Sequence, residues 1–328
     1  MAQILIENIT KTFKVSKRKE GLLNTLLGVF HREHTIIKAL DSISFEIDEG
    51  ELVGYIGPNG AGKSTTIKIL SGILVPDSGQ CKVLGRIPWK ERIEHVKNIG
   101  VVFGQKTQLW WDLPVIESFE LLKDIYKIRE KEYKRTLEEL IEVLNIKSLL
   151  DIPVRQLSLG QRMRCELSAS LIHSPAILFL DEPTIGLDAV SKLAIREFIK
   201  RINVEKKITI ILTTHDMDDI ETLCSRIIVI GNGKILYDGT MEGLRKKVSR
   251  DRILIIDIED GKDFDLKLDG IKNISNENSR WYVTFDPEKI PPSELIFKIT
   301  NIYNVKDLFV ENPPIEEIIA RFYQEQSI

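Results

Sequence analysis

The chain has 328 residues, 43% hydrophobic and 29% charged, which is typical of a globular protein with one large domain and one small one. This composition excludes a disordered or collagen-like chain. No window holds the roughly 18 to 20 consecutive apolar residues of a membrane span. A net charge of −3 gives no general electrostatic reason to bind nucleic acid. Cys81, Cys165 and Cys224 lie far apart and the N-terminus lacks a signal-peptide pattern, so we expect free thiols in a cytosolic protein.

The N-terminal region is expected to form two strands separated by a basic insertion. Apolar and polar residues alternate around Ile4 and Ile6 and again over residues 42–47, as in half-buried strands. Residues 14–38 between them carry six Lys or Arg and two Glu, a net charge of +4. Apolar residues at helical spacing in this insertion indicate a short amphipathic helix: Leu22, Leu23, Leu26, Leu27 and Phe30. That helix would pack against the neighbouring sheet or contact a membrane or a membrane partner, and the sequence leaves both open.

A glycine-rich loop follows an apolar strand at residues 52–56 and precedes a helical segment. It fits the pattern G-x-x-x-x-G-K-[ST] in the strand, loop, helix order that this phosphate-binding motif requires. Glycines let backbone N–H groups turn inward around phosphate oxygens, and the helix directs the positive end of its dipole at the anion. Lys63 would add a charge at the β- and γ-phosphates, and the Ser64 hydroxyl would bind Mg²⁺. The predicted phosphate contacts are Gly57, Pro58, Asn59, Gly60, Ala61, Gly62, Lys63, Ser64, Thr65 and Thr66.

Helical and strand patterns then alternate to the end of the large domain. Apolar residues at helical spacing over 117–146 predict an all-helical subdomain at about residues 106–165. The apolar runs at 177–180 and 208–212 are typical of parallel strands covered on both faces, which predicts an α/β fold. Short strands and two helices over 248–328 predict a separate small α+β domain, acidic by a net charge of −6 from residue 250 on. The large domain is expected to span residues 1–247.

The apolar run at 177–180 ends in two adjacent carboxylates, Asp181 and Glu182. Because adjacent residues on a strand point to opposite sides, Asp181 can serve a hydrated Mg²⁺ while Glu182 faces a water beyond the γ-phosphate. Glu182 is therefore the candidate that orients or deprotonates this water. An acid pair at a strand end is weak evidence alone and gains its weight from the upstream phosphate loop.

Further short motifs surround the acid pair in a fixed order. Gln105 follows Val-Val-Phe-Gly, Leu-Ser-Leu-Gly-Gln occupies residues 157–161, Gly-Leu-Asp ends at Asp188, and His215 follows Leu-Thr-Thr. With these motifs, residues 4–244 resemble the nucleotide-binding subunit of an ATP-binding-cassette (ABC) transporter. They match the family's Q-loop, its LSGGQ signature with Leu159 at the third position, its D-loop and its switch histidine. Phe13 lies where the family's adenine-stacking aromatic residue would be.

This resemblance implies a P-loop NTPase ABC cassette: a RecA-like parallel sheet core, an antiparallel β subdomain and a helical subdomain. It implies an ATPase that uses ATP and Mg²⁺, with Glu182, His215 and Gln105 as catalytic residues and Ser64, Gln105 and Asp181 as metal ligands. Further nucleotide contacts would be Phe13, Ser158, Gly160, Gln161, Asp181 and Asp188. Two cassettes, the second being a copy of this chain or a paralogue, would stack head to tail so that ATP on Lys63 of one meets Ser158 and Gly160 of the other.

Three other segments are similar to a bacterial or archaeal exporter branch that includes viologen and drug exporters. They are the basic insertion, residues 104–114 with Trp110 and Trp111, and the tail domain ending Asn-Pro-Pro-Ile. The branch implies polytopic membrane permease subunits as partners, met near the two tryptophans, and a peripheral position on the inner face of the cell membrane, without nucleic acid. Burial of a tryptophan in the helical subdomain is the alternative. Two other functions stay open: a soluble ABC ATPase of DNA repair or translation, and a nucleotide-gated regulator acting through the tail.

Overall fold

The computed structural model describes residues 2–16, 34–104, 106–259, 266, 268–277 and 280–326. The helix expected within the basic insertion and the Q-loop residue Gln105 lie outside the described residues. The chain divides into two compact units, Met1–Thr240 and Met241–Ile328, and each is described here by itself.

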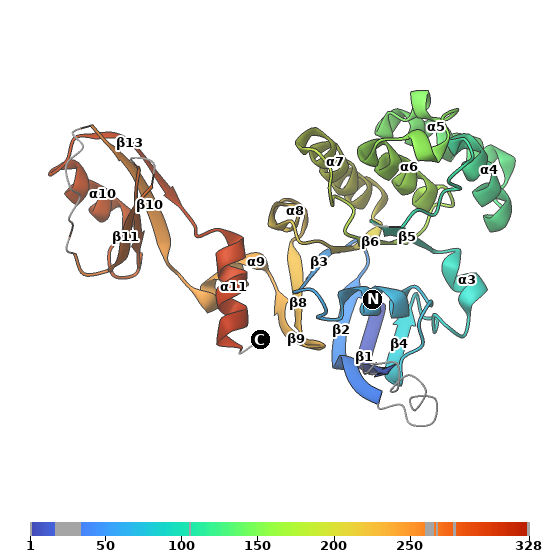
Figure 1. The fold of residues 1–328 in the computed structure, drawn as a ribbon, viewed down its shortest axis with the longest axis horizontal. Coiled ribbons are helices and arrows are strands. Elements are labelled where there is room, and N and C mark those ends of the chain that lie inside the picture. The colour runs from blue at the N-terminus through green and yellow to red at the C-terminus, as the bar shows by residue number, and fades with distance from the viewer. Residues whose placement is uncertain are drawn as a thin grey trace, which may run out of the picture. The chain divides into compact units, whose positions relative to one another are not determined.

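The first unit is built on a six-stranded sheet (Figure 1) with the order β5-β6-β7-β3-β8-β9. All neighbouring strands pair in parallel except β8 and β9. The central strands consist almost entirely of buried residues, which is why their sequences are continuously apolar. The α/β fold predicted from the sequence is confirmed. The strands are β3 (Leu52–Ile56), β5 (Ile99–Phe103), β6 (Ile177–Asp181), β7 (Thr209–Thr213), β8 (Arg226–Gly231) and β9 (Lys234–Gly239).

Strand order places the two predicted halves of the site at one edge of this sheet. Strands β3 and β6 both pair with β7, and all three run in the same direction. The segments that leave their carboxyl ends therefore lie beside one another, which is where parallel sheets bind ligands. The phosphate loop follows β3, and the acid pair ends β6.

An antiparallel sheet packs against the core of the same unit, with the order β2-β1-β4. Its strands are β1 (Ala2–Ser16), β2 (His34–Asp48) and β4 (Ser78–Val83). The alternating residues Ile4, Ile6, Ile43 and Ile47 are all buried in one cluster with Tyr55 of β3. Both long strands reach further than the alternation indicates, so residues expected to belong to the basic insertion at each end are paired strand residues.

Helices of the first unit cover the core sheet and form a separate helical group, α4, α5 and α6, which Figure 1 shows apart from β1, β2 and β4. The helical pattern over 117–146 is interrupted in the structure, because Lys127 takes a left-handed conformation (φ 53°) and ends α4. The apolar spacing continues across this break and so did not reveal it. The helices are α2 (Lys63–Leu70), α3 (Arg92–Val96), α4 (Val115–Tyr126), α5 (Glu130–Leu144), η1 (Lys147–Leu149), η2 (Val154–Gln156), α6 (Leu159–Leu171), α7 (Ala189–Lys206) and α8 (Met217–Leu223).

The second unit is a four-stranded antiparallel sheet with helices, in the order β11-β12-β10-β13. Its core joins Leu254 and Val283 of the sheet to Leu295 and Ile299 of a helix. The short strands predicted in this domain, at residues 253–258, 281–285 and 305–310, match β10, β12 and β13, whereas β11, whose exposed residues are all polar, was missed. The elements are α9 (Met241–Val248), β10 (Arg252–Ile258), β11 (Ile271–Glu277), β12 (Arg280–Phe285), α10 (Pro292–Thr300), β13 (Val305–Glu311) and α11 (Ile315–Glu325).

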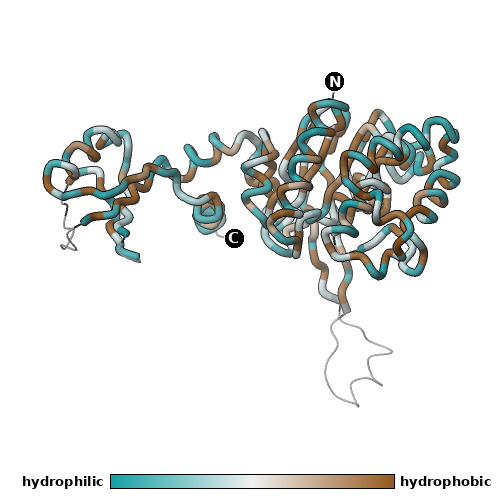
Figure 2. Tube along the Cα trace, turned by 90° about the horizontal axis from the view of Figure 1, so that it is seen from above, coloured by the Kyte–Doolittle hydropathy of each residue, from teal (hydrophilic) through white to brown (hydrophobic). Residues whose placement is uncertain are grey.

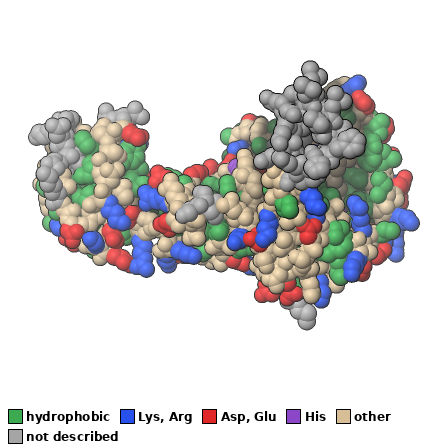
Figure 3. Space-filling model, turned by 60° about the horizontal axis from the view of Figure 1, so that its bottom comes forward, with side chains coloured by type: hydrophobic (Ala, Val, Ile, Leu, Met, Phe, Trp, Pro, Cys, Tyr) green, Lys and Arg blue, Asp and Glu red, His purple; other side chains and the backbone are tan. Residues whose placement is uncertain are grey.

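Hydrophilic and hydrophobic residues are mixed along the described parts of the chain (Figure 2). None of the helices within the described ranges combines the length and apolar character that a bilayer span requires. Acidic and basic side chains are interspersed over the face of the molecule drawn in Figure 3.

His173 makes the stability of the first unit depend on pH. Its ring stacks on Tyr126 of α4 with 3.9 Å between ring centroids, and its Nε2 donates to the Ile99 carbonyl at 2.9 Å. Burial lowers the pKa of His173 to about 4. The unfolded chain takes up a proton near pH 6.5 and the folded one does not, so the free energy of unfolding should fall by roughly 3 kcal/mol as pH drops from about 6.5 to 4.

We expect His173→Phe, which keeps the stack but cannot take up a proton, to lose less stability on acidification than the wild type. Urea denaturation at pH 7 and at pH 4.5 measures the loss in each protein. Comparing the two losses removes the contribution of the carboxylates that they share. Equal losses in both proteins would contradict the role given to His173.

Candidate functional site

The phosphate loop connects β3 to α2 and takes a shape that its glycines permit. Gly60 and Gly62 have φ values of 82° and 113°, in the left-handed region that other residues rarely adopt. A Cβ on Gly57 would lie 2.4 Å from the Ile230 carbonyl oxygen of β8, so the loop can pass this close to its neighbour only with glycine there. The backbone of the loop is thus held in place by the sheet.

The Lys63 side chain lies within the loop, where its Nζ donates to the carbonyls of Gly57 at 2.6 Å and Pro58 at 3.1 Å. Burial lowers the pKa of Lys63, and the carboxylates of Glu182 and Asp181 oppose this shift. Lys63 is therefore a buried cation close to the acid pair, as the sequence predicted for a group that meets the outer phosphates.

The first turn of α2 carries one buried hydroxyl group and two accessible ones. Thr66 is buried, donates to the Gly62 carbonyl at 3.1 Å and lies 3.1 Å from the Tyr55 hydroxyl, so it stabilises the turn. Ser64 is exposed and Thr65 is half-buried, so both hydroxyls are accessible. Asn59 and Gly60 of the loop are exposed as well.

The acid pair at the end of β6 has a geometry that strand alternation did not predict. Asp181 accepts a hydrogen bond from the Thr213 hydroxyl at 2.5 Å. Glu182 has left-handed φ of 57°, and its N–H donates to the Thr213 carbonyl at 2.9 Å. The different directions of the two carboxylates therefore come from this backbone turn after the strand. A residue other than glycine in this conformation is strained and persists only where the surrounding contacts hold it.

Glu182 and His215 form a direct pair: the His215 Nε2 lies 2.6 Å from the Glu182 Oε1. The histidine is 43% exposed and the glutamate 19%, so the pair opens to solvent on the histidine side. Gly104, next to the Q-loop position, packs closely against the same turn. A Cβ at this position would lie 2.2 Å from the Glu182 carbonyl oxygen, so only glycine fits there. The structure thus brings together Lys63, Asp181, Glu182 and His215, four residues that the sequence placed in one site.

The oxygen donors suit Mg²⁺ with phosphate and water completing its shell. Asp181 offers a carboxylate and Ser64 a hydroxyl, which are hard ligands of the kind that Mg²⁺ prefers. Within the described ranges no three His, Cys, Asp or Glu side chains group to hold a metal on their own. A magnesium ion that arrives with the nucleotide fits this donor set.

The signature residues begin α6, on a different element from the phosphate loop. Ser158 caps the helix: its hydroxyl accepts from the Gln161 N–H at 3.2 Å, and its own N–H donates to the Gln161 side chain at 2.9 Å. Ser158 is exposed, whereas Gly160 is buried against α7, where a Cβ would lie 2.5 Å from the Ser191 hydroxyl.

Asp188 of the D-loop caps α7 in the same way. It accepts from the Ser191 N–H at 2.9 Å and from the Ser191 hydroxyl at 2.8 Å. These bonds lower the pKa of Asp188. Ser191 therefore links the D-loop carboxylate to the glycine of the signature.

Three predicted aromatic residues are accessible. Phe13 on β1 is 39% exposed, with the Lys11 ammonium 5.8 Å from its ring centre, so it is not a core residue. Trp110 and Trp111 are 39% and 48% exposed, which argues against burial in the helical subdomain. The Arg162 guanidinium lies 5.9 Å from the Trp111 ring.

Sequence reasoning missed Glu166, which anchors the segment after Gln105 to the signature helix. Glu166 is buried on α6 and accepts from the Thr107 hydroxyl and, at 3.2 Å, from the Gln108 N–H. The Gln108 side-chain amide donates a hydrogen bond to the Glu166 backbone carbonyl at 3.0 Å. Burial raises the pKa of Glu166. The available signal was a charged residue on the apolar side of a helix.

Comparison with known proteins identifies the family of this chain. The family profile described as "ABC transporter" matches residues 40–185. The ABC transporter ATP-binding protein NatA of Bacillus subtilis is 34% identical over 215 residues, which cover 66% of this chain and 87% of NatA. The chain belongs to the family of ABC transporter ATP-binding subunits, and the class predicted from the motifs is confirmed.

Two further relatives extend this comparison. The probable multidrug ABC transporter ATP-binding protein YbhF of Escherichia coli is 38% identical over 215 residues, or 65% of this chain, but the match spans only 36% of YbhF. The dimeric structure of the ATP-binding cassette MJ0796 bound to ADP and Pi superimposes with a TM-score of 0.60 at 27% identity, covering 73% of this chain and 98% of MJ0796.

Proposed function

We propose that this chain hydrolyses ATP to drive transport of a small molecule, by export, through separate membrane subunits. The observation that carries the proposal is the Glu182–His215 pair, 2.6 Å apart, beside a phosphate loop whose Lys63 lies close to the same carboxylate. The name of YbhF, a probable multidrug transporter protein, supports export as the direction.

The residues divide the work of hydrolysis. Lys63 and the loop N–H groups bind the phosphates, and Mg²⁺, when bound with the nucleotide at Ser64, Asp181 and Gln105, would neutralise the charge that develops on the transferred phosphoryl group. Glu182 orients a water for in-line attack and accepts its proton. His215 positions the Glu182 carboxylate. Phe13 stacks on the base.

The site is completed by a second cassette, either a second copy or a paralogue, whose Ser158, Gly160 and Gln161 reach the γ-phosphate, with Asp188 at the junction. The dimeric structure of MJ0796 supports this arrangement. Two charge-assisted hydrogen bonds at each of two sites contribute about 6 to 12 kcal/mol, and association costs about 4 to 15 kcal/mol. Because these terms nearly balance, the nucleotide decides whether the dimer is closed, and hydrolysis reopens it.

We also propose the placement of this activity in the chain and the cell. Residues 1–247 form the cassette, with the helical subdomain at about 106–165, and residues 248–328 form an accessory domain. The exposed Trp110 and Trp111 contact the membrane subunits, which holds the protein on the inner face of the cell membrane.

Capture of the tagged protein from detergent-solubilised native membranes tests the transport function. We expect a polytopic membrane protein in stoichiometric amount, and the double variant Trp110→Ala/Trp111→Ala should retain less of it than the wild type. Reproducible capture of only ribosomal or DNA-repair proteins in the presence of ATP would contradict transport and leave an ATPase of another pathway.

A further inference from the structure

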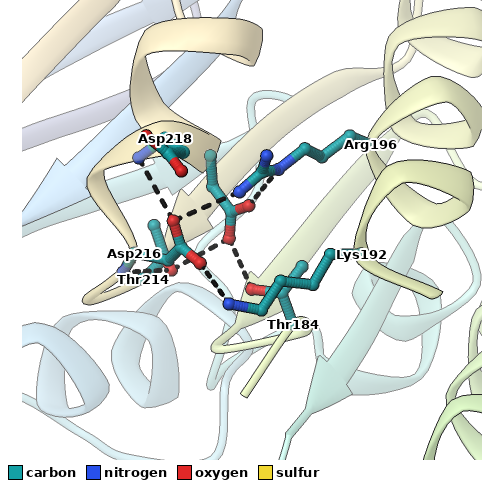
Figure 4. A network of polar contacts seen from close by, with 7 residues as sticks. Thr184, Lys192, Arg196, Thr214, Asp216 and Asp218 are labelled. Atoms are coloured by element: carbon teal, nitrogen blue, oxygen red, sulfur yellow. Dashed lines mark hydrogen bonds and ion pairs between the residues drawn. The ribbon is translucent and has the colours of Figure 1, made fainter. Parts of the chain in front are cut away.

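A buried carboxylate outside the predicted site joins the two segments that carry Glu182 and His215. Asp219 on α8 is fully buried. One of its oxygens accepts from the Arg196 Nε at 2.5 Å, and the other accepts from the Thr214 hydroxyl at 3.1 Å and from the Thr184 hydroxyl. Figure 4 shows Thr184, Arg196 and Thr214 converging from three different segments of the chain.

Two of these partners are close in sequence to Glu182 and His215. Thr184 comes two residues after Glu182, and Thr214 immediately precedes His215. A single side chain thus fixes both the turn that carries the glutamate and the loop that carries the histidine. Among the described residues, the hydrogen bonds of the Asp219 carboxylate go to Arg196, Thr184 and Thr214, so it acts on Glu182 and His215 through their neighbours.

A second carboxylate extends the network around the histidine loop. Asp216, directly after His215, accepts from the Lys192 Nζ at 2.5 Å and from the Arg196 Nη2 at 3.2 Å. Its N–H donates to the Thr214 hydroxyl at 3.0 Å. Because Lys192 and Arg196 lie on α7, which Asp188 of the D-loop caps, the network also ties the histidine loop to the D-loop helix (Figure 4).

Burying the Asp219 carboxylate costs free energy, and a role in positioning explains why a charged group is present there. Burying a carboxylate is favourable only if its charge is paired and its oxygens are hydrogen-bonded, and the groups that satisfy it are then held rigidly. The left-handed turn at Glu182 also needs surrounding contacts to persist. The bond between Thr184 and Asp219 supplies one of them directly after the turn.

We infer that Asp219, with Arg196, is a positioning residue for ATP hydrolysis, which keeps the Glu182 carboxylate and the His215 ring within hydrogen-bonding distance. The inference rests on the proposed function, because it concerns the same hydrolytic step. It predicts that loss of the network slows turnover and leaves the phosphate loop able to bind nucleotide.

The first test is Asp219→Asn, whose amide nitrogen cannot accept a hydrogen bond. We expect kcat for ATP hydrolysis to fall about 100-fold, the size of effect that a displacement of about 1 Å produces, while the Kd for ATP stays within about twofold of the wild type. Asp218→Asn is the matched control, because Asp218 is exposed on the same helix and joins the network through its backbone N–H alone. Its kcat should equal that of the wild type.

A double-mutant cycle with His215→Ala separates positioning from general weakening of the fold. Because Asp219 acts partly through His215, Asp219→Asn should lower kcat less in the His215→Ala background than in the wild type, by about the tenfold expected from losing the tie to the Glu182 turn alone. Multiplicative losses in the double variant would overturn the inference, as would an unchanged kcat in Asp219→Asn. A wild type without ATPase activity would instead overturn the proposed function.

Thr184→Val is a second test, which applies even if Asp219→Asn does not fold. Valine has the shape of threonine and leaves the Asp219–Arg196 ion pair in place, so only the tie to the Glu182 turn is removed. We expect a folded Thr184→Val to lose about tenfold in kcat, the equivalent of one hydrogen bond. A folded Thr184→Val with wild-type kcat would contradict the inference.

Discussion

Replacement of Glu182 by glutamine is expected to lower ATP turnover by about 100- to 10,000-fold, the range for loss of a general base. The amide cannot accept the proton of the attacking water, and the positive charges of the phosphate loop are untouched. ATP should therefore still bind, and the bridging γ-phosphate should persist. We expect light scattering to show a shift from monomer toward dimer in the presence of Mg²⁺ and ATP, at protein concentrations where the wild type returns to monomer.

Glu138→Gln is a suitable control, because Glu138 is exposed on α5 in the helical group and makes the same change of charge. Its turnover and its oligomeric state with ATP should match those of the wild type. If Glu182→Gln hydrolysed ATP at the wild-type rate, Glu182 would not be the base. If it bound ATP without any shift in size, the γ-phosphate would not hold two cassettes together.

Lys63→Ala is expected to lose nucleotide binding. Hydrogen bonds from a charged donor contribute about 1.5 to 3 kcal/mol each, so the loss of two of them to phosphate oxygens should weaken ATP binding at least about 100-fold. The fold should survive, because the hydrogen bonds that the Lys63 side chain makes within the described part of the chain go to two carbonyls of its own loop. Isothermal titration with ATP and Mg²⁺ measures the effect.

Lys68→Ala provides the comparison for this variant. Lys68 lies on the same helix, α2, and is exposed at its far end, so it shares the helix and the charge but not the loop. Its affinity for ATP should be unchanged. A wild-type Kd for ATP in a correctly folded Lys63→Ala would contradict phosphate binding by this loop.

Local sequence patterns predicted those parts of the site that lie within one short segment. The phosphate loop, Asp181 at a strand end and the continuous apolar strands each leave a pattern in neighbouring residues. The structure has the predicted strand, loop and helix in order and confirms the parallel sheet. The direction of Glu182 was not predictable from alternation, because it depends on a left-handed turn that is held by Gly104, directly after β5, and by Thr213 of β7.

The contacts that the sequence did not reveal are those between distant segments. Glu166 meets residues 58 and 59 positions away, and Asp219 meets Arg196 and Thr184 across 23 and 35 positions. A single charged residue in an amphipathic helix has many possible partners, and spacing alone does not select one. The weakly patterned edge strand β11 was missed for a related reason, because its exposed polar residues give no alternation. The roles of Gln105 and of the signature residues remain predictions.

Phosphate release by the purified wild-type protein, followed across a range of protein concentrations with saturating ATP and Mg²⁺, tests the central claim most directly. A site completed by Ser158 and Gly160 of a second copy exists only in the dimer, so turnover per chain should rise with concentration and level off as the dimer forms. The same turnover per chain at every concentration, or no release at any concentration, would contradict a catalytic site shared between two copies.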